Sequence, residues 1–188
     1  MRIIGGQARG LKLADLGAGD AAAHLRPTSD RVREAIFNLL INGANPVSLE
    51  GARVLDLFAG TGALGLEALS RGAAHCVFVD DGATARAILR QNIEKMRAMG
   101  ITKVFRRDAT RLGENRGPGF TLVFLDPPYR RGLGEQALAS AQAGGWLAPG
   151  AHIVWEEAQP QIVPPGFTLI DQRRYGDTSV TLLEAPTG

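Results

Sequence analysis

Short apolar runs alternate with segments of helical periodicity from residue 53 onward, and this alternation organises most of the chain. Apolar residues that recur every three or four positions predict helices, whereas short continuous runs predict buried strands. Strands separated by helices are typical of strand–helix–strand units and a parallel sheet. The pattern predicts strands at 53–58, 75–80, 103–107, 121–126 and 152–156, with helices near 64–70, 84–99 and 135–143.

The C-terminal part of the chain changes character. Residues 167–174 and 179–184 flank Tyr175-Gly176-Asp177-Thr178, a turn sequence between two strand-like runs. A tight turn between such runs predicts an antiparallel hairpin, which closes the sheet with two more strands. The expected fold is therefore α/β, with a mostly parallel seven-stranded sheet and helices on both faces.

Two further elements are expected before the sheet. Apolar residues recur at helical spacing after Ser29 and Asp30, which predicts a helix over 30–42. Arg2-Ile3-Ile4 and Leu11-Lys12-Leu13 bracket a glycine-rich turn, which predicts a small β-hairpin. We expect two parts: a basic N-terminal hairpin and loop at 1–24, and the α/β domain at 25–188.

Length and composition narrow the class of protein. The chain has 188 residues, 45% of them hydrophobic, enough for one compact domain with a real core. Its apolar stretches are too short to cross a bilayer, and residues 1–6 lack the apolar core of a secretory signal, so we expect a cytoplasmic protein. The single Cys76 excludes an internal disulfide and lies in an expected strand, which favours core packing.

Positive charge gathers at the N-terminus. The net charge of +2 does not by itself indicate nucleic-acid binding. Residues 1–33, however, contain six basic residues against three acidic ones, an excess of three positive charges. A solvated surface would account for this excess as well as an RNA-binding patch. The candidate RNA-binding residues are Arg2, Arg9, Lys12, Arg26, Arg31 and Arg33.

A glycine-rich loop follows the first expected strand. Gly60-Thr61-Gly62-Ala63-Leu64-Gly65 matches G-x-G-x-x-G, the pattern of dinucleotide-binding loops, so an NAD-dependent oxidoreductase has to be considered. Asp56 argues against that enzyme because a carboxylate would face the pyrophosphate. S-adenosylmethionine has no phosphate and carries an ammonium and a sulfonium group. A nearby carboxylate would stabilise these positive charges. The candidate cofactor residues here are Asp56, Phe58, Gly60 and Gly62.

Acidic residues also follow the next two expected strands. Asp80 stands twenty residues after Gly60, where a carboxylate can accept hydrogen bonds from both ribose hydroxyls. Asp108-Ala109 follows the third strand, beside the expected position of an adenine. Each Asp could instead cap a helix or a turn. Because the carboxyl ends of successive parallel strands share one edge, we expect these residues to form a single pocket.

The fourth strand runs into Asp126-Pro127-Pro128-Tyr129. Two prolines stiffen the loop and leave carbonyl groups as acceptors. The exocyclic amine of a base is a poor nucleophile because its lone pair is delocalised into the ring. Hydrogen bonds from that amine to the Asp126 carboxylate and the Pro127 carbonyl would localise the lone pair, while Tyr129 would stack on the base. The alternative is a stiff strand end with Tyr129 packed on the core.

These motifs together resemble the RsmD family of 16S rRNA guanine-N2 methyltransferases, within the class I S-adenosylmethionine-dependent enzymes. The resemblance spans nearly the whole chain. Besides the cofactor loop and Asp126-Pro127-Pro128-Tyr129, the segments that carry it are Arg2-Ile3-Ile4-Gly5-Gly6 with Arg9-Gly10, residues 26–38 and Arg174-Tyr175-Gly176-Asp177-Thr178. The sequence departs at Asp80-Asp81, where such proteins often have Glu, and in the Ala- and Gly-rich loop at 15–24.

The resemblance implies a Rossmann-like fold, S-adenosylmethionine as cofactor, and methylation of a guanine N2 amine in 16S rRNA. The small ribosomal subunit or its assembly intermediate would be the partner, and we expect a monomer that does not bind membranes. The alternatives are an amino-methyltransferase acting on DNA adenine or cytosine or on protein glutamine, and a non-catalytic assembly factor. His24, His75 and His152 share no metal-ligand spacing, so no metal is expected.

Overall fold

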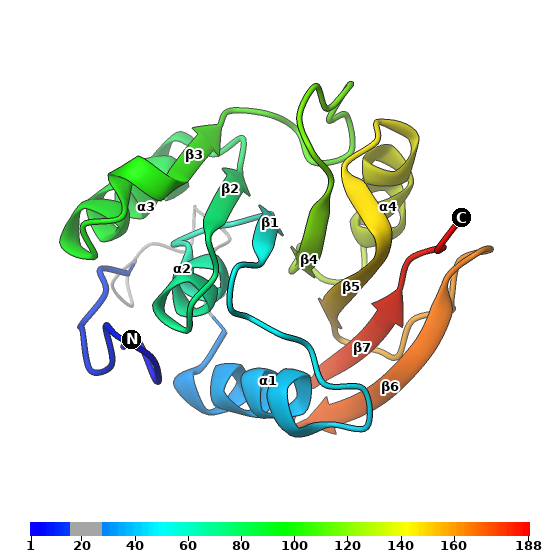
Figure 1. Cartoon of the computed structure of the whole chain (residues 1–188), viewed down its shortest axis with the longest axis horizontal. Coiled ribbons are helices and arrows are strands. Elements are labelled where there is room, and N and C mark those ends of the chain that lie inside the picture. Colours follow the sequence, from blue (N-terminus) through cyan, green and yellow to red (C-terminus); the bar gives the residue numbers. More distant parts are fainter. Residues whose placement is uncertain (16–27) are drawn as a thin grey trace.

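A computed structural model describes residues 1–15 and 28–188 of the chain. It contains one seven-stranded sheet with the strand order β3-β2-β1-β4-β5-β7-β6 (Figure 1). The strands are β1 Arg53–Leu57, β2 His75–Val79, β3 Thr102–Phe105, β4 Phe120–Leu125, β5 Leu147–Glu157, β6 Thr168–Tyr175 and β7 Thr178–Glu184. The pairs among β1 to β5 are parallel, whereas β7 pairs antiparallel with β5 and β6. The mostly parallel seven-stranded sheet predicted from the sequence is therefore confirmed.

Helices cover both faces of the sheet, as expected. Because successive side chains of a strand point to opposite faces, alternate residues enter two separate core clusters. Val54 and Phe124 belong to one cluster, and Leu55 and Leu125 to the other. The first cluster includes residues of α1 Asp30–Asn42, α2 Ala63–Ser70 and α3 Ala83–Lys95, and the second includes residues of α4 Leu133–Ala143.

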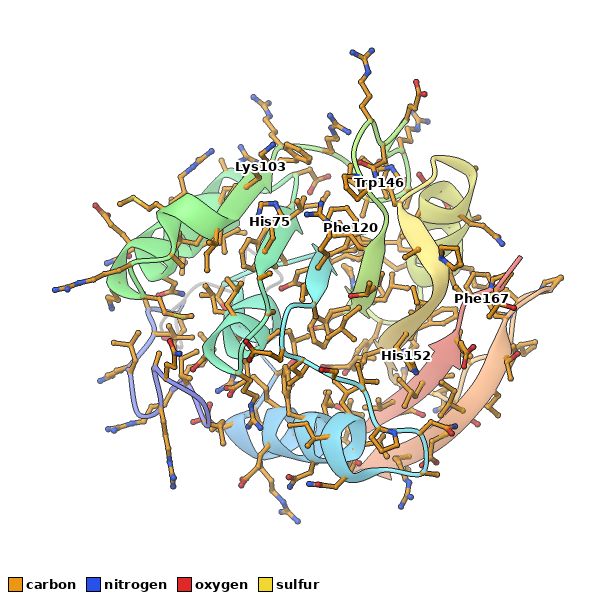
Figure 2. All side chains as sticks on the ribbon, in the orientation of Figure 1. His75, Lys103, Phe120, Trp146, His152 and Phe167 are labelled. Atoms are coloured by element: carbon orange, nitrogen blue, oxygen red, sulfur yellow. The ribbon has the colours of Figure 1, made fainter. Side chains whose placement is uncertain are left out.

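The second cluster is closed at one end by aromatic side chains. Trp146 and Phe120 stack with their ring centroids 6.0 Å apart (Figure 2). The indole N–H of Trp146 donates to the carbonyl of Gly113 at 2.9 Å, which ties the connection between β3 and β4 to this face. None of the described helices is both long and apolar enough to cross a membrane.

The observed helices and strands differ from the predicted ones mainly at their ends. The helix over 30–42 is confirmed, with the Ser29 hydroxyl accepting from Val32 N–H at 3.2 Å as its cap. The third helix ends at Lys95 instead of at 99, because Arg97 adopts a left-handed conformation with φ 54°. The fifth strand begins at Leu147 instead of at 152, because Pro149 and Gly150 interrupt its apolar pattern without ending the strand.

The N-terminal segment forms a small turn of antiparallel character. Arg2 and Lys12 form an antiparallel bridge, and Ile3 N–H donates to the Leu11 carbonyl at 2.9 Å. The turn between them lies against α2: a Cβ on Gly6 would stand 1.9 Å from the Ser70 carbonyl oxygen, so this position requires glycine. The boundary expected between residues 24 and 25 lies outside the residues described.

Glu67 of α2 joins this hairpin to the domain. Its buried carboxylate accepts from the backbone N–H groups of Ile4 and Gly5 at 2.8 and 2.9 Å. It also forms ion pairs with Arg33 Nε at 3.3 Å and with Arg71 Nε at 2.9 Å. A carboxylate removed from water in this way is stabilised only while these donors surround it. One side chain therefore holds the hairpin, α1 and α2 together.

Candidate active site

A cavity of about 880 Å³ opens at the carboxyl ends of the central strands. The β1–α2 loop, the β2–α3 loop and the loop after β4 contribute most of its walls. The strand order places β1 between β2 and β4, so these three loops meet at one edge of the sheet. This edge is where open α/β sheets bind ligands. The sequence-predicted residues that line the cavity are Asp56, Phe58, Gly60, Asp80, Asp126, Pro127, Pro128 and Tyr129.

The glycine loop follows β1 with a strained backbone. Phe58 has φ 57°, a conformation that is uncommon for residues other than glycine and often marks a functional site. Gly62 caps α2 with φ 84°, and a Cβ there would stand 2.3 Å from Leu89 Cδ1. Asp56 Oδ2 accepts from Gly65 N–H at 3.0 Å, which fixes the first turn of the helix against the strand. Gly62 thus supports the loop and is not itself a lining residue.

Asp80 links the two loops on its side of the cavity. Its Oδ2 accepts from Gly60 N–H at 2.9 Å, and its Oδ1 accepts from Gly82 N–H at 2.8 Å. The neighbouring Asp81 is exposed and also lines the cavity. Both acids of the pair therefore lie where a ligand would reach them.

Acidic side chains dominate the charged lining of the cavity. Asp56, Asp80, Asp81 and Asp126 line it, against a single described cation, Arg131. Burial raises the pKa of Asp56 well above its usual range, and the nearby carboxylates of Asp126 and Asp80 raise it further. A bound cation would relieve this repulsion, whereas a pyrophosphate would increase it. The chemistry of the lining groups thus fits the sulfonium and ammonium of S-adenosylmethionine and not a dinucleotide.

The loop after β4 is held at several points. Tyr129 Oη lies 3.1 Å from Thr178 Oγ1 on β7, so the ring is tied to the antiparallel hairpin. Arg130 has φ 64°, and its N–H donates to Glu157 Oε1 at 3.1 Å. Pro127 is buried, whereas Asp126 and Tyr129 are half-buried and line the cavity. The loop is a fixed structure and presents an acid and an aromatic ring to the same space.

Two residues without a predicted role stand beside Asp126. The hydroxyl of Thr28 lies 3.2 Å from Asp126 Oδ2 and 3.1 Å from Glu156 Oε1. Glu156 is only 2% exposed, and Leu125 pairs with Trp155 in the sheet, so Asp126 and Glu156 follow equivalent positions of neighbouring strands. In the sequence, the one signal for Glu156 is an acid at the end of an expected strand.

Asp108 and Ala109, expected at the cofactor pocket, are not among the residues that line this cavity. Asp108 Oδ1 accepts from the N–H and the hydroxyl of Thr110 at 2.8 and 2.7 Å, so this carboxylate stabilises a turn. The hydroxyl bond and the backbone bond lower the pKa of Asp108. Ala109 is buried in the second core cluster.

The predicted basic residues divide into two groups. Arg2, Arg9, Lys12 and Arg31 are exposed, and Arg26 lies outside the described residues. Arg33 is fully buried and pairs with Glu67 and Asp30, and its guanidinium also donates to the Arg2 carbonyl. Its assignment to an RNA-binding surface is therefore wrong, because the packed side chain has no surface that RNA could contact.

The sheet order and the cavity at the carboxyl ends of β1, β2 and β4 define a Rossmann-like class I methyltransferase fold. The family described as "Conserved hypothetical protein 95" matches residues 1–184. Ribosomal RNA small subunit methyltransferase D of Escherichia coli (strain K12) is 38% identical over 98% of this chain and 89% of that protein. The protein of the same name from Haemophilus influenzae is 34% identical over 98% of this chain and 93% of its own length.

A solved structure of the candidate methyltransferase yhhF from Escherichia coli superimposes with a TM-score of 0.84. It is 36% identical and covers 100% of this chain and 99% of its own. With relatives of this similarity over nearly the full length, the chain belongs to the RsmD family of methyltransferases.

Proposed function

We propose that this protein transfers a methyl group from S-adenosylmethionine to the exocyclic N2 amine of a guanine in 16S rRNA. The observation that carries the proposal is the position of Asp126 and Tyr129 at the wall of the acidic cavity. A carboxylate, carbonyl groups and an aromatic ring meet there next to a space that favours a cationic ligand. The names of the relatives, which are methyltransferases of small-subunit ribosomal RNA, support this class of substrate.

The cavity would hold the cofactor through its acidic residues and its glycine loop. When bound, S-adenosylmethionine supplies an electrophilic methyl group. Asp56 would face the positive charges, and Asp80 or its neighbour Asp81 would accept hydrogen bonds from the ribose. Gly60 would let the backbone approach the ligand without an intervening side chain.

The loop after β4 would bind and activate the target base. Asp126 would accept a hydrogen bond from one N–H of the amine and the Pro127 carbonyl from the other, which localises the lone pair for attack. Tyr129 would stack on the base, a contact worth about 1 to 3 kcal/mol. We propose the small ribosomal subunit or its assembly intermediate as the partner, which implies a cytoplasmic protein, and that the protein acts as a monomer.

Labelled methyl transfer tests this function directly. This protein should transfer label from S-adenosylmethionine to small ribosomal subunits that come from cells lacking it. The modified nucleotide should be a guanine in 16S rRNA. Subunits from cells that contain the protein are the control and should accept little label, because the position is already methylated. Transfer to duplex DNA or to protein in place of ribosomal RNA would favour the competing amino-methyltransferase substrates.

The exposed basic residues of the N-terminal hairpin would bind RNA phosphates. Replacing Arg9 and Lys12 together by Ala should weaken binding of the subunit RNA and lower the salt dependence of the affinity. Two lost phosphate contacts lower the slope of log K against log salt by at most about 1.4 to 1.8. Fluorescence anisotropy at several salt concentrations measures this.

Lys103 and Arg116 provide the matched control for that variant. Both are exposed, and they stand near the amino ends of β3 and β4, away from the cavity (Lys103 in Figure 2). Their replacement by Ala removes the same charge. Equal salt slopes for the two double variants would mean that the hairpin charges are ordinary solvated surface.

A further inference from the structure

Thr28 stands between two carboxyl groups with a single hydrogen to share. Its Oγ1 lies 3.2 Å from Asp126 Oδ2, and 3.1 and 3.2 Å from the two carboxyl oxygens of Glu156. A hydroxyl carries one donor and two lone pairs, so it can donate to only one of these groups at a time. Its contact with the other carboxyl is favourable when that group carries a proton and donates to the Thr28 oxygen.

Glu156 is the group that would hold the proton. It is 2% exposed, whereas Asp126 lies at the cavity wall and is half-buried. Burial raises the pKa of Glu156 well above its usual range, and the charge of Asp126 raises it further. From the other elements around it, the hydrogen bond from Thr28, which precedes α1, lowers this pKa. Asp56 of β1 raises it, and Arg33 of α1 lowers it. Burial and the neighbouring acids thus favour the neutral form of Glu156.

We propose that Glu156 is a positioning residue: its neutral carboxyl donates to the Thr28 hydroxyl, which donates to Asp126 and orients that side chain toward the substrate amine. The role rests on the proposed function of Asp126 as the acceptor of the substrate amine. Asp177 and Tyr129 line a second cavity of about 180 Å³ with Thr28 and Glu156, so this chain of hydrogen bonds lies beside the catalytic loop. Asp126 is thereby held by Thr28 and, through Thr28, by Glu156, which does not line the first cavity.

Variants of Glu156 separate this role from a structural one. Glu156→Gln keeps a donor toward Thr28 at every pH, whereas Glu156→Ala removes it. We expect kcat of Glu156→Ala to fall about 10- to 100-fold with little change in the affinity for S-adenosylmethionine, since small displacements of a reacting group cost this much. Glu156→Gln should recover at least 10-fold of that loss. Equal losses for the two variants would overturn the proposal.

The pH profile provides a second measurement. When the pH exceeds the pKa of Glu156 in the folded protein, Glu156 becomes negatively charged and competes with Asp126 for the hydrogen of the Thr28 hydroxyl. The kcat of the native enzyme should therefore fall. Glu156→Gln should lack this alkaline decline, while Glu184→Gln, which removes a charge from the same sheet outside the cavity, should keep it. Thr28→Val, which keeps the side-chain shape but not the hydroxyl, should lower kcat as Glu156→Ala does. An undiminished kcat for Thr28→Val would also overturn the proposal.

Unfolding experiments test the protonation of Glu156 without any methyl transfer. Its folded-state pKa lies above its unfolded-state value, so folding takes up a proton and the native protein loses stability as pH rises between these two values. The stability of Glu156→Gln relative to the native protein should therefore increase over that interval. A pH-independent difference would mean that Glu156 is ionised in the folded state. If the native protein transfers no methyl group, the proposed function fails, but this measurement still decides the state of Glu156.

Discussion

Replacing Asp126 by Ala is expected to reduce methyl transfer by about 10²- to 10⁴-fold, the usual contribution of a positioned acid or base. The side chain lies at the end of β4, at the wall of the cavity and against Thr28. Cofactor binding should survive, because Asp56 and Asp80 still line the cavity. Single-turnover transfer to ribosomal subunits and calorimetric titration with S-adenosylmethionine measure the two effects separately.

A control for this variant is Glu114→Ala, which removes an exposed acid from the connection between β3 and β4. Asp126→Asn adds a second comparison, because it keeps one carbonyl acceptor but loses the charge. Its rate should fall between those of the native protein and Asp126→Ala. Full turnover by Asp126→Ala would rule out the proposed role of this carboxylate.

Replacing Glu67 by Ala should destabilise the protein by about 3 to 5 kcal/mol, the usual cost of breaking a buried ion pair by removing one partner. Arg33 would stay buried with its buried counter-charge gone, and the N–H groups of Ile4 and Gly5 would lose their acceptor. For a chain of this length the melting temperature should fall by roughly 6 to 20 °C. Urea unfolding and thermal melts measure the change.

Two further variants make this result specific. Glu34→Ala removes an exposed acid from α1 and should change stability by less than about 0.5 kcal/mol. Combining Glu67→Leu with Arg33→Met removes both charges, so it should be less destabilising than Glu67→Ala alone. A double variant as unstable as Glu67→Ala would show that the loss comes from packing and the unsatisfied N–H groups and not from the unpaired guanidinium.

The mostly parallel sheet follows from the sequence because local signals agree with the global fold. The apolar runs of β1, β2 and β4 are bounded by turn residues. The Ser29 cap marks the residue at which the first helix begins. The ends of other elements depend on tertiary contacts. The early start of β5 arises where Phe120 pairs with Leu147 across an irregular register, which no local pattern indicates.

Among the candidate site residues, those directly after β1, β2 and β4 could be predicted, because parallel strands bring their carboxyl ends to one edge. Glu156 could not, because its proximity to Asp126 depends on the register of Leu125 with Trp155. The burial of Arg33 could not be predicted for a similar reason, because its partner Glu67 lies on another helix. A charged residue in a basic segment is usually exposed. Asp108 comes after β3, and one oxygen of its carboxylate accepts hydrogen bonds from Thr110 within a local turn.

If a base stacks on Tyr129 as proposed, the hydrogen bond between Tyr129 and Thr178 would influence RNA selection. A ring already restrained by the antiparallel hairpin of β6 and β7 would lose little rotational freedom when a nucleobase stacks on it, so more of the stacking energy would contribute to affinity. The same restraint sets the plane in which an incoming base must lie. A base that tilts out of this plane to form other contacts would lose the stacking, which favours one angle of entry over many.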